Sequence, residues 1–372
     1  MHLDDRSPSD MPLSDPTSSS SSSGRFADQV EKLRAAPESV HPVTTISEKA
    51  VLRWTSDPAA KILREVFDGF DKSRLEVSIQ PLAVSSTYLV DSGRPGPLRR
   101  ISGGIHGNEL CGPEAVLKLL EGYASGGRTL ESGGVVLMLG NEGALLENKR
   151  YLDENLNRMM GKVSGVEGSE VGRAQALMSV LRGDLPELHK FAGQRQFALD
   201  LHSTSLPTPM FVWAERFHVA ALEQLGVPNA VIHQLSTLPE DYQRTVQCYC
   251  TRNEVLCFTV ECGQNTEEQT FLNATQTVDR FLQFSNAEPK TLAPQPLERL
   301  GLYVEDHRMT PGFQFTEHFK SFQFLRKGTE IARDNERVYI MKADGYLLFP
   351  HYDPPSLRIG KEETHMVAQK LK

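Results

Sequence analysis

Apolar and polar positions along the chain follow a rhythm of short strands and longer helices. Apolar runs typical of strands occur at residues 82–90, 135–139, 197–201, 211–213 and 256–260. Helical periodicity covers residues 26–36, 58–68, 112–123, 168–182, 216–225 and 267–284. Since strands alternate with helices, we expect an α/β fold built on a mixed, mainly parallel sheet with helices on both faces.

The pattern changes at both ends of the chain. Residues 1–24 are mostly Ser, Pro and Asp, which predicts a disordered serine-rich tail, because such a segment cannot offset its ordering entropy by burial. An inert extension is favoured over a phosphorylation or docking role. The α/β domain is expected over residues 25–288, followed by a Pro-containing linker at 288–296. Short strand-like runs beyond it predict a smaller β-rich domain over 297–372.

Composition narrows the class of protein. The 372 residues include 40 Lys and Arg against 48 Asp and Glu, and the net charge of −8 argues against a general nucleic-acid binder. The longest apolar runs are far shorter than the ~20 residues of a membrane helix. Five cysteines are too few, and odd in number, for a disulfide scaffold. The first residues contain no apolar segment of the kind found in secretory signals, so we expect a cytoplasmic protein.

The first candidate for chemistry is the segment Gly103–Glu109, which reads GGIHGNE between an apolar stretch and a helix. His106 and Glu109 are three residues apart at this turn, and both can reach one metal ion. With 11 histidines in the chain, His106 taken alone is equally well explained as an ordinary surface or core residue. The surrounding glycines favour a site, because they permit a tight turn at the carboxyl end of a strand, where α/β sheets bind ligands.

The second candidate is the sequence Asp200-Leu201-His202 at the end of the apolar run 197–201. Asp200 and His202 share one face of a strand, so Asp200 is suited to hold the second nitrogen of a metal-bound histidine. A strand that simply ends in polar residues is the alternative. Together with His106 and Glu109, His202 completes a His₂Glu set with an open fourth position, which is typical of a catalytic zinc site with one zinc ion per chain.

Two further segments carry candidate catalytic groups. Glu261 ends the apolar run 256–260, which suits a general base beside a metal-bound water, although a salt-bridged structural glutamate is the alternative. Arg150 and Arg158 lie eight residues apart, with Asn157 beside the second. These side chains suit recognition of a carboxylate and of a developing oxyanion, whereas the run by itself is also typical of a solvated basic loop.

In this order, the motifs GxHGNE, NxxAxxxxxRYxxxxLNR, DLH and VExG resemble the succinylglutamate desuccinylase/aspartoacylase family over about residues 97 to 360. The resemblance implies a zinc enzyme with a carboxypeptidase-like α/β fold and a β-rich C-terminal domain. It assigns the zinc ligands to His106, Glu109 and His202, and the general base to Glu261.

The resemblance also implies roles for the basic residues. Arg150 polarises the scissile carbonyl, and Asn157 and Arg158 bind a substrate carboxylate. Arg252, nine residues before Glu261, lies close to the place of a substrate-binding arginine in the family.

The implied reaction, within amino-acid metabolism such as arginine catabolism, is hydrolysis of a small N-acyl amino acid, with neither nucleic acid nor membrane as partner. Self-association is left open. Several positive and amide donors near one zinc favour N-succinylglutamate, because it carries carboxylates on both sides of the amide. The segment Ser203–Pro207 is closer to the aspartoacylases, and Asn155 stands where an aspartate is common. N-acetylaspartate is therefore the alternative substrate. A metallocarboxypeptidase and a non-catalytic binding protein are the rival functions.

Overall fold

The computed structural model describes residues 45–73, 75–161, 165, 168–216, 219–284, 298–303, 310–350 and 365–370. The tail predicted at 1–24, the helix predicted at 26–36 and the linker predicted at 288–296 lie outside the described residues. The domain limits therefore remain predictions.

The structure is a mixed α/β fold with many strands. The strands are β1 Ser78–Pro81, β2 Thr87–Asp91, β3 Leu98–Gly103, β4 Gly134–Leu139, β5 Gln196–Thr204, β6 Phe211–Glu215, β7 Asn229–His233, β8 Leu256–Gln264, β9 Glu298–Tyr303, β10 Gln314–Phe315, β11 Gln323–Leu325, β12 Glu330–Arg333, β13 Val338–Ile340, β14 Gly345–Leu348 and β15 Met366–Lys370. The helices are α2 Ile46–Ser56, α3 Ala59–Asp68, α4 Cys111–Ala124, α5 Glu142–Leu146, α6 Glu170–Arg182, α7 Val219–Leu225, α8 Val246–Arg252 and α9 Glu268–Phe284. Short 3₁₀ turns are η1 Leu156–Arg158, η2 Pro186–Phe191, η4 Leu235–Thr237 and η5 Tyr242–Arg244.

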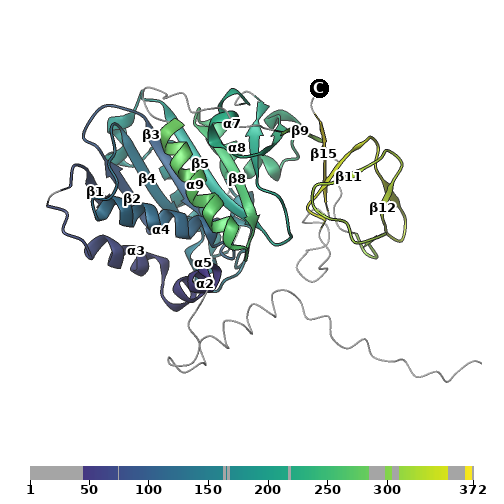
Figure 1. Ribbon diagram of the computed structural model, residues 1–372, viewed down its shortest axis with the longest axis horizontal. Coiled ribbons are helices and arrows are strands. Elements are labelled where there is room, and N and C mark those ends of the chain that lie inside the picture. The colour runs from purple at the N-terminus through teal and green to yellow at the C-terminus, as the bar shows by residue number, and fades with distance from the viewer. Residues whose placement is uncertain are drawn as a thin grey trace, which may run out of the picture. The chain divides into compact units, whose positions relative to one another are not determined.

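The described strands form one twelve-stranded sheet and one three-stranded sheet (Figure 1). The order in the large sheet is β1-β2-β4-β3-β5-β8-β6-β7-β9-β15-β14-β11, and in the small one β10-β12-β13. Strands β4, β3, β5 and β8 run parallel to one another, while β2 and β6 pair antiparallel on either side of them. The predicted mixed α/β sheet is thus confirmed, and the carboxyl ends of the parallel strands meet at one edge.

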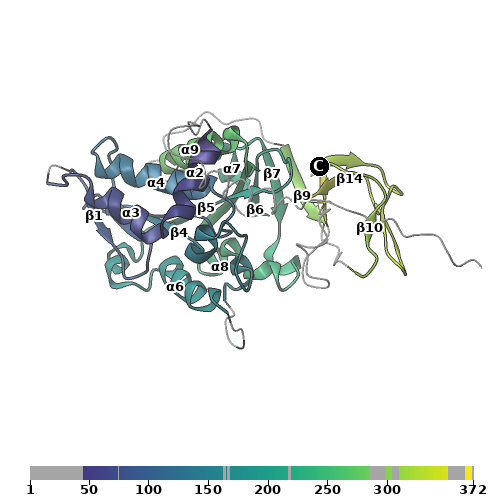
Figure 2. The same ribbon diagram turned by 90° about the horizontal axis from the view of Figure 1, so that it is seen from below.

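Helices cover both faces of the sheet. Figure 2 shows α4 and α9 on one face and α6 and α8 on the other. A large apolar cluster joins β3, β4 and β5 to α6 and α8, with buried side chains that include Leu98, Val136, Leu177 and Cys250. None of the helices in the described parts of the chain has the length and hydrophobicity that a bilayer crossing requires.

The structure corrects several predicted elements. Of the single strand predicted at 82–90, only residues 87–90 lie in β2, whereas residues 82–86 form the turn that joins β1 to β2. The apolar alternation continues through this turn, where Leu82 and Val84 are buried. The strand expected before the Gly103–Glu109 turn is β3, whose bounds were not predicted, since Arg99 and Arg100 interrupt its apolar pattern. Both arginines are nevertheless buried. Elements α2, β7 and α8 also lack a predicted counterpart; β7 and α8 are short, with five and seven residues.

Arg100 shows how a buried arginine fits into a strand. Its guanidinium donates to the carbonyl of Val180 at 3.0 Å and to Gln196 Oε1 at 2.9 Å. Burial lowers the pKa of Arg100 to about 10. The long side chain thus reaches the end of α6, so the strand keeps its backbone pairing despite a charged sequence.

Candidate active site

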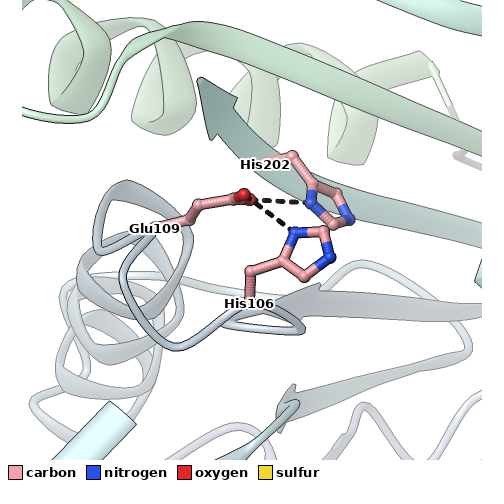
Figure 3. A group of neighbouring side chains, drawn as sticks. All are labelled: His106, Glu109 and His202. Carbon is pink, nitrogen blue, oxygen red and sulfur yellow. Dashed lines mark hydrogen bonds and ion pairs between the residues drawn. The ribbon is translucent and has the colours of Figure 1, made fainter. Parts of the chain in front are cut away.

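Two histidines and a glutamate converge at the carboxyl edge of the parallel strands (Figure 3). His106 Nδ1 lies 2.8 Å from Glu109 Oε1, and His202 Nδ1 lies 2.8 Å from Glu109 Oε2. One ligand atom from each residue lies within 4.8 Å of the others, and all three residues are buried. Two imidazole nitrogens and a carboxylate at this spacing can hold a divalent cation.

The fold explains why these residues meet. His106 and Glu109 lie in the turn between β3 and α4, whereas His202 lies on β5, which pairs parallel to β3. The turn is tight, with Gly104 at a φ of +72°. At Gly107, an added Cβ would lie 2.1 Å from the backbone carbon of Ala144, so only glycine lets the turn pass against α5. The glycines noted in the sequence therefore shape the metal loop, residues 104–109.

Each histidine is held at its other nitrogen by an acceptor. His202 Nε2 lies 2.9 Å from Asp200 Oδ2, and Ser102 Oγ donates to Asp200 Oδ1 at 2.7 Å. His106 Nε2 lies 3.1 Å from Asn155 Oδ1. An N–H at each Nε2 leaves the Nδ1 lone pairs directed at the space beside Glu109, which is the tautomer that a metal ligand needs. The donor set therefore fits a zinc ion.

The pKa values of the three clustered side chains are all shifted from their usual ranges. Burial lowers the pKa of His106 to about 4, with a further contribution from Arg150. For Glu109, burial raises the pKa, but the two histidines lower it more, and it lies well below its usual range. Burial likewise lowers the pKa of His202, yet Asp200 and Glu109 raise it well above the usual range. Glu109 is thus ionised, which is the form in which a carboxylate binds a cation.

Glu261 lies on β8 as the register partner of His202 on β5. Its Oε2 atom is buried and, within the described residues, has no hydrogen-bond partner. Burial raises the pKa of Glu261 to about 7; Glu109 reinforces this rise, while His202 and Arg150 oppose it. A carboxylate with a pKa near neutrality and an unengaged oxygen can accept and return a proton.

Arg150 contacts the cluster directly. Its Nη1 donates to Glu109 Oε1 at 2.8 Å, while the side chain remains 41% exposed. Its backbone carbonyl accepts a hydrogen bond from the nitrogen of Gly107 at 3.2 Å. The guanidinium therefore lies beside the candidate metal ligands and is partly open to solvent.

Asn157 and Arg158 lie in η1, shortly after Asn155. Asn157 is buried, and its Oδ1 accepts a hydrogen bond from the nitrogen of Val246 at 2.9 Å. The Arg158 guanidinium carbon lies 4.6 Å from the centre of the Tyr242 ring. Asn157 therefore has a structural contact with the start of α8 in addition to the substrate role predicted for it.

Arg252 ends α8 and folds back along it. Its Nη2 donates to the carbonyl of Gln243, and its Nη1 lies near Gly161, where it is 3.8 Å from the position of an added Cβ. Gly161 follows closely after Arg158 in the chain. The structure thus brings Arg252 toward the turn that follows η1, and its substrate role remains a prediction.

Three contacts of the site were not anticipated as site contacts. Ser102 faces Asp200 because the two are register partners on β3 and β5, a relationship hidden by the arginines in β3. Asn155 holds His106 across the site, and its position beside the LNR motif was the available signal. Arg150 also pairs with the ligand Glu109, although it was expected only to polarise a substrate carbonyl.

The sequence of residues 95–285 matches the succinylglutamate desuccinylase/aspartoacylase catalytic domain. The chain belongs to this family. Among members of the succinylglutamate desuccinylase/aspartoacylase family, the succinylglutamate desuccinylase of Erwinia tasmaniensis is 27% identical over 293 residues, which cover 72% of this chain and 83% of that protein. The predicted family membership is thus confirmed.

Two solved structures show the same fold. The crystal structure of succinylglutamate desuccinylase from Vibrio cholerae has a TM-score of 0.65 and 17% sequence identity, covering 83% of this chain and 94% of that chain. The crystal structure of murine aminoacylase 3 has a TM-score of 0.54 and 17% sequence identity, and the match covers 75% of this chain and 96% of that chain. At these identities the two likenesses establish the fold alone.

Proposed function

We propose that the chain is a zinc-dependent deacylase that hydrolyses the amide bond of an N-acyl amino acid, with N-succinylglutamate as the first candidate substrate. The observation that carries the proposal is the buried cluster of His106, Glu109 and His202 with Glu261 beside it, one oxygen of which has no hydrogen-bond partner within the described residues. Membership of the family and the names of its relatives support the same chemistry.

The metal would be held by His106 Nδ1, His202 Nδ1 and the carboxylate of Glu109. A zinc ion held there supplies Lewis-acid polarisation of a carbonyl and a lower pKa for water. Asp200 and Asn155 keep the two imidazoles in the tautomer that binds the cation.

The remaining steps belong to side chains of the protein. Glu261 takes a proton from the attacking water, whose oxygen bonds to the amide carbon. The guanidinium of Arg150 donates to the carbonyl oxygen as negative charge develops there. Glu261 then passes the proton to the amide nitrogen, the C–N bond breaks, and a carboxylic acid and a free amino acid leave.

The substrate ranking rests on charge. Arg150, Asn157 and Arg158 place several donors on one short loop, which contacts the cluster through Arg150 and Asn155. A substrate with a carboxylate on the acyl side and others on the amino-acid side uses more of these donors than an N-acetyl compound does. The hydroxyl-rich segment Ser203–Pro207 favours the alternative substrate, N-acetylaspartate.

A panel assay tests the function. Purified protein is assayed for metal content and for hydrolysis of N-succinylglutamate, N-acetylglutamate, N-acetylaspartate and a peptide with a free C-terminus. We expect kcat/KM for N-succinylglutamate to exceed that for N-acetylglutamate by more than ~100-fold, because losing the partner of a buried charge costs that much. Equal or better turnover of N-acetylaspartate would replace the ranking with an aspartoacylase activity. Peptide hydrolysis would indicate a carboxypeptidase, and zinc binding without turnover a binding protein.

A further inference from the structure

The loop of residues 150–158 carries most of the basic and amide groups assigned to substrate, yet it is irregular until η1 begins at Leu156. Arg150 opens the loop, Asn155 contacts His106, and Asn157 and Arg158 close it. Groups on one irregular loop can act together on a substrate only if the backbone between them is held in one shape. The segment between Arg150 and Asn155 is where such support is needed.

The carboxylate of Glu170, at the start of α6, lies against this segment. Oε1 accepts from the nitrogen of Leu152 at 2.6 Å and from Asn141 Nδ2 at 3.0 Å. Oε2 accepts from the nitrogens of Asp153 and Glu154, each at 3.2 Å. Glu170 is 1% exposed. Four N–H donors thus converge on one buried carboxylate, and three of them are consecutive backbone groups of the loop.

The contact is reciprocal. Asp153, on the loop, accepts from the nitrogen of Ser169 at 2.8 Å, in the residue that precedes α6. Ser169 Oγ lies 2.8 Å from Asp153 Oδ2 and 3.0 Å from Glu170 Oε2, so its hydroxyl bridges the two carboxylates. The loop and the start of α6 therefore hold each other through both of their acidic side chains. We name this set of contacts between residues 152–154 and 169–170 the Glu170 clasp.

The Glu170 clasp continues to the metal loop through Asn141. While Nδ2 of Asn141 donates to Glu170, its backbone nitrogen donates to the carbonyl of Gly104 at 2.7 Å. On the other side, the nitrogen of Gly107 donates to the carbonyl of Arg150 at 3.2 Å. A chain of hydrogen bonds thus joins α6, the 150–158 loop and the metal loop.

We propose that Glu170 is a positioning residue that fixes the 150–158 loop, and with it Arg150 and Arg158, relative to the metal cluster. The proposal rests on the proposed function, since it concerns the loop that serves substrate there. Glu170 itself is too deeply buried beneath the loop backbone to meet a substrate.

Glutamine is the sharpest substitution at this position. Its side chain has nearly the same shape, but an amide offers one acceptor oxygen and turns the other atom into a donor. Because donors face both oxygens of Glu170, either orientation of the amide in Glu170→Gln points an NH₂ group at loop or Asn141 donors. A buried N–H donor that faces another donor loses its hydrogen bond. The loop should therefore become more mobile, although the side chain fills the same volume.

The experiment compares wild type, Glu170→Gln and the control Asp184→Asn. Asp184 makes an exposed ion pair with Arg182 at the opposite end of α6, so its variant removes the same charge without touching the loop. We expect Glu170→Gln to retain its zinc, to raise KM for N-succinylglutamate about 10-fold and to lower kcat/KM about 10- to 100-fold, because misplacement by about 1 Å costs that much. Asp184→Asn should match wild type.

The kinetic split distinguishes positioning from general support. If Glu170 served only stability, the folded fraction of the variant would keep the wild-type KM, and that result would overturn the proposal. If Glu170→Gln does not fold, Ser169→Ala carries the test, since it removes only the bridging hydroxyl. It should raise KM about two- to five-fold, and an unchanged KM would again contradict the proposal.

Hydrogen exchange gives a readout that does not depend on turnover. The amides of residues 152–154 should exchange about 10-fold faster in Glu170→Gln, while those of β5 stay protected. Unchanged exchange at 152–154 would refute the Glu170 clasp. If wild type hydrolyses none of the panel, the proposed function fails, while exchange at these amides still decides whether the clasp exists.

Discussion

His202 and Glu261 are register partners on the adjacent parallel strands β5 and β8, although β6, α7, β7 and α8 separate them in the chain. In this register their Cβ atoms point to the same face of the sheet. Backbone hydrogen bonds thus fix the distance between a ligand of the metal cluster and the proposed base. The two residues can be tested separately, because one is expected to serve metal binding and the other only proton transfer.

Metal binding should depend on the two histidines. Purified wild type is expected to carry about one zinc per chain, and His106→Ala or His202→Ala should lower zinc affinity more than ~100-fold, since each removes one of three ligands. Atomic absorption and competition with a chelator measure both quantities. His189, which is exposed and contacts the carbonyl of Asp184, supplies the control variant His189→Ala. Full zinc occupancy in the double variant of His106 and His202 would refute the site.

Glu261→Gln should separate metal binding from catalysis. The amide keeps the shape of the side chain but cannot take a proton from water, so kcat should fall at least ~100-fold while zinc content stays unchanged. Glu267→Gln, an exposed substitution just beyond β8, is the matched control and should behave as wild type. Turnover near the wild-type rate in a zinc-loaded Glu261→Gln protein would exclude Glu261 as the base.

Arg158 should act mainly on substrate affinity. Arg158→Ala is expected to raise KM for N-succinylglutamate at least ~10-fold, because a carboxylate of the substrate loses a charged partner. Arg182→Ala, which removes an exposed arginine of α6 paired with Asp184, controls for the change in net charge. Arg252→Ala, measured in the same assay, tests the other arginine predicted to bind substrate. An unchanged KM in Arg158→Ala or in Arg252→Ala would exclude that arginine from the substrate site.

Glu170 should make stability depend on pH. Burial raises its pKa, but hydrogen bonds from Asn141 and the loop nitrogens lower it more, so the pKa lies below the ordinary 4.5. A lowered folded-state pKa adds stability above the ordinary value, and this contribution disappears as the pH falls through the folded-state pKa. The difference in free energy of unfolding between wild type and Glu170→Gln should therefore be largest near pH 7. It should shrink between about pH 5 and pH 3 in urea titrations. A difference that stays constant with pH would contradict the ionised Glu170 of the structure.

Much of the fold and of the metal cluster could be predicted because the signals are local. The apolar runs at 197–201 and 256–260 are the cores of β5 and β8, and His202 and Glu261 follow their last apolar residues. The bounds of strand β3 could not be predicted, because Arg100 interrupts the apolar pattern, although its guanidinium donates to a carbonyl at the end of α6. No local sequence pattern shows that a carbonyl distant in the chain will accept a hydrogen bond from a buried arginine.

The sequence by itself determined which residue types stand at the strand ends, and with them the family and the candidate metal ligands His106, Glu109 and His202. Strand alternation and the meeting of parallel strand ends are consequences of backbone geometry, so they can be inferred from spacing alone. Only the tertiary structure decided that Asn155 holds His106 and that Glu170 holds the 150–158 loop. Those contacts join segments that are distant in sequence and depend on how the loop packs against α6, which no periodicity of the chain encodes.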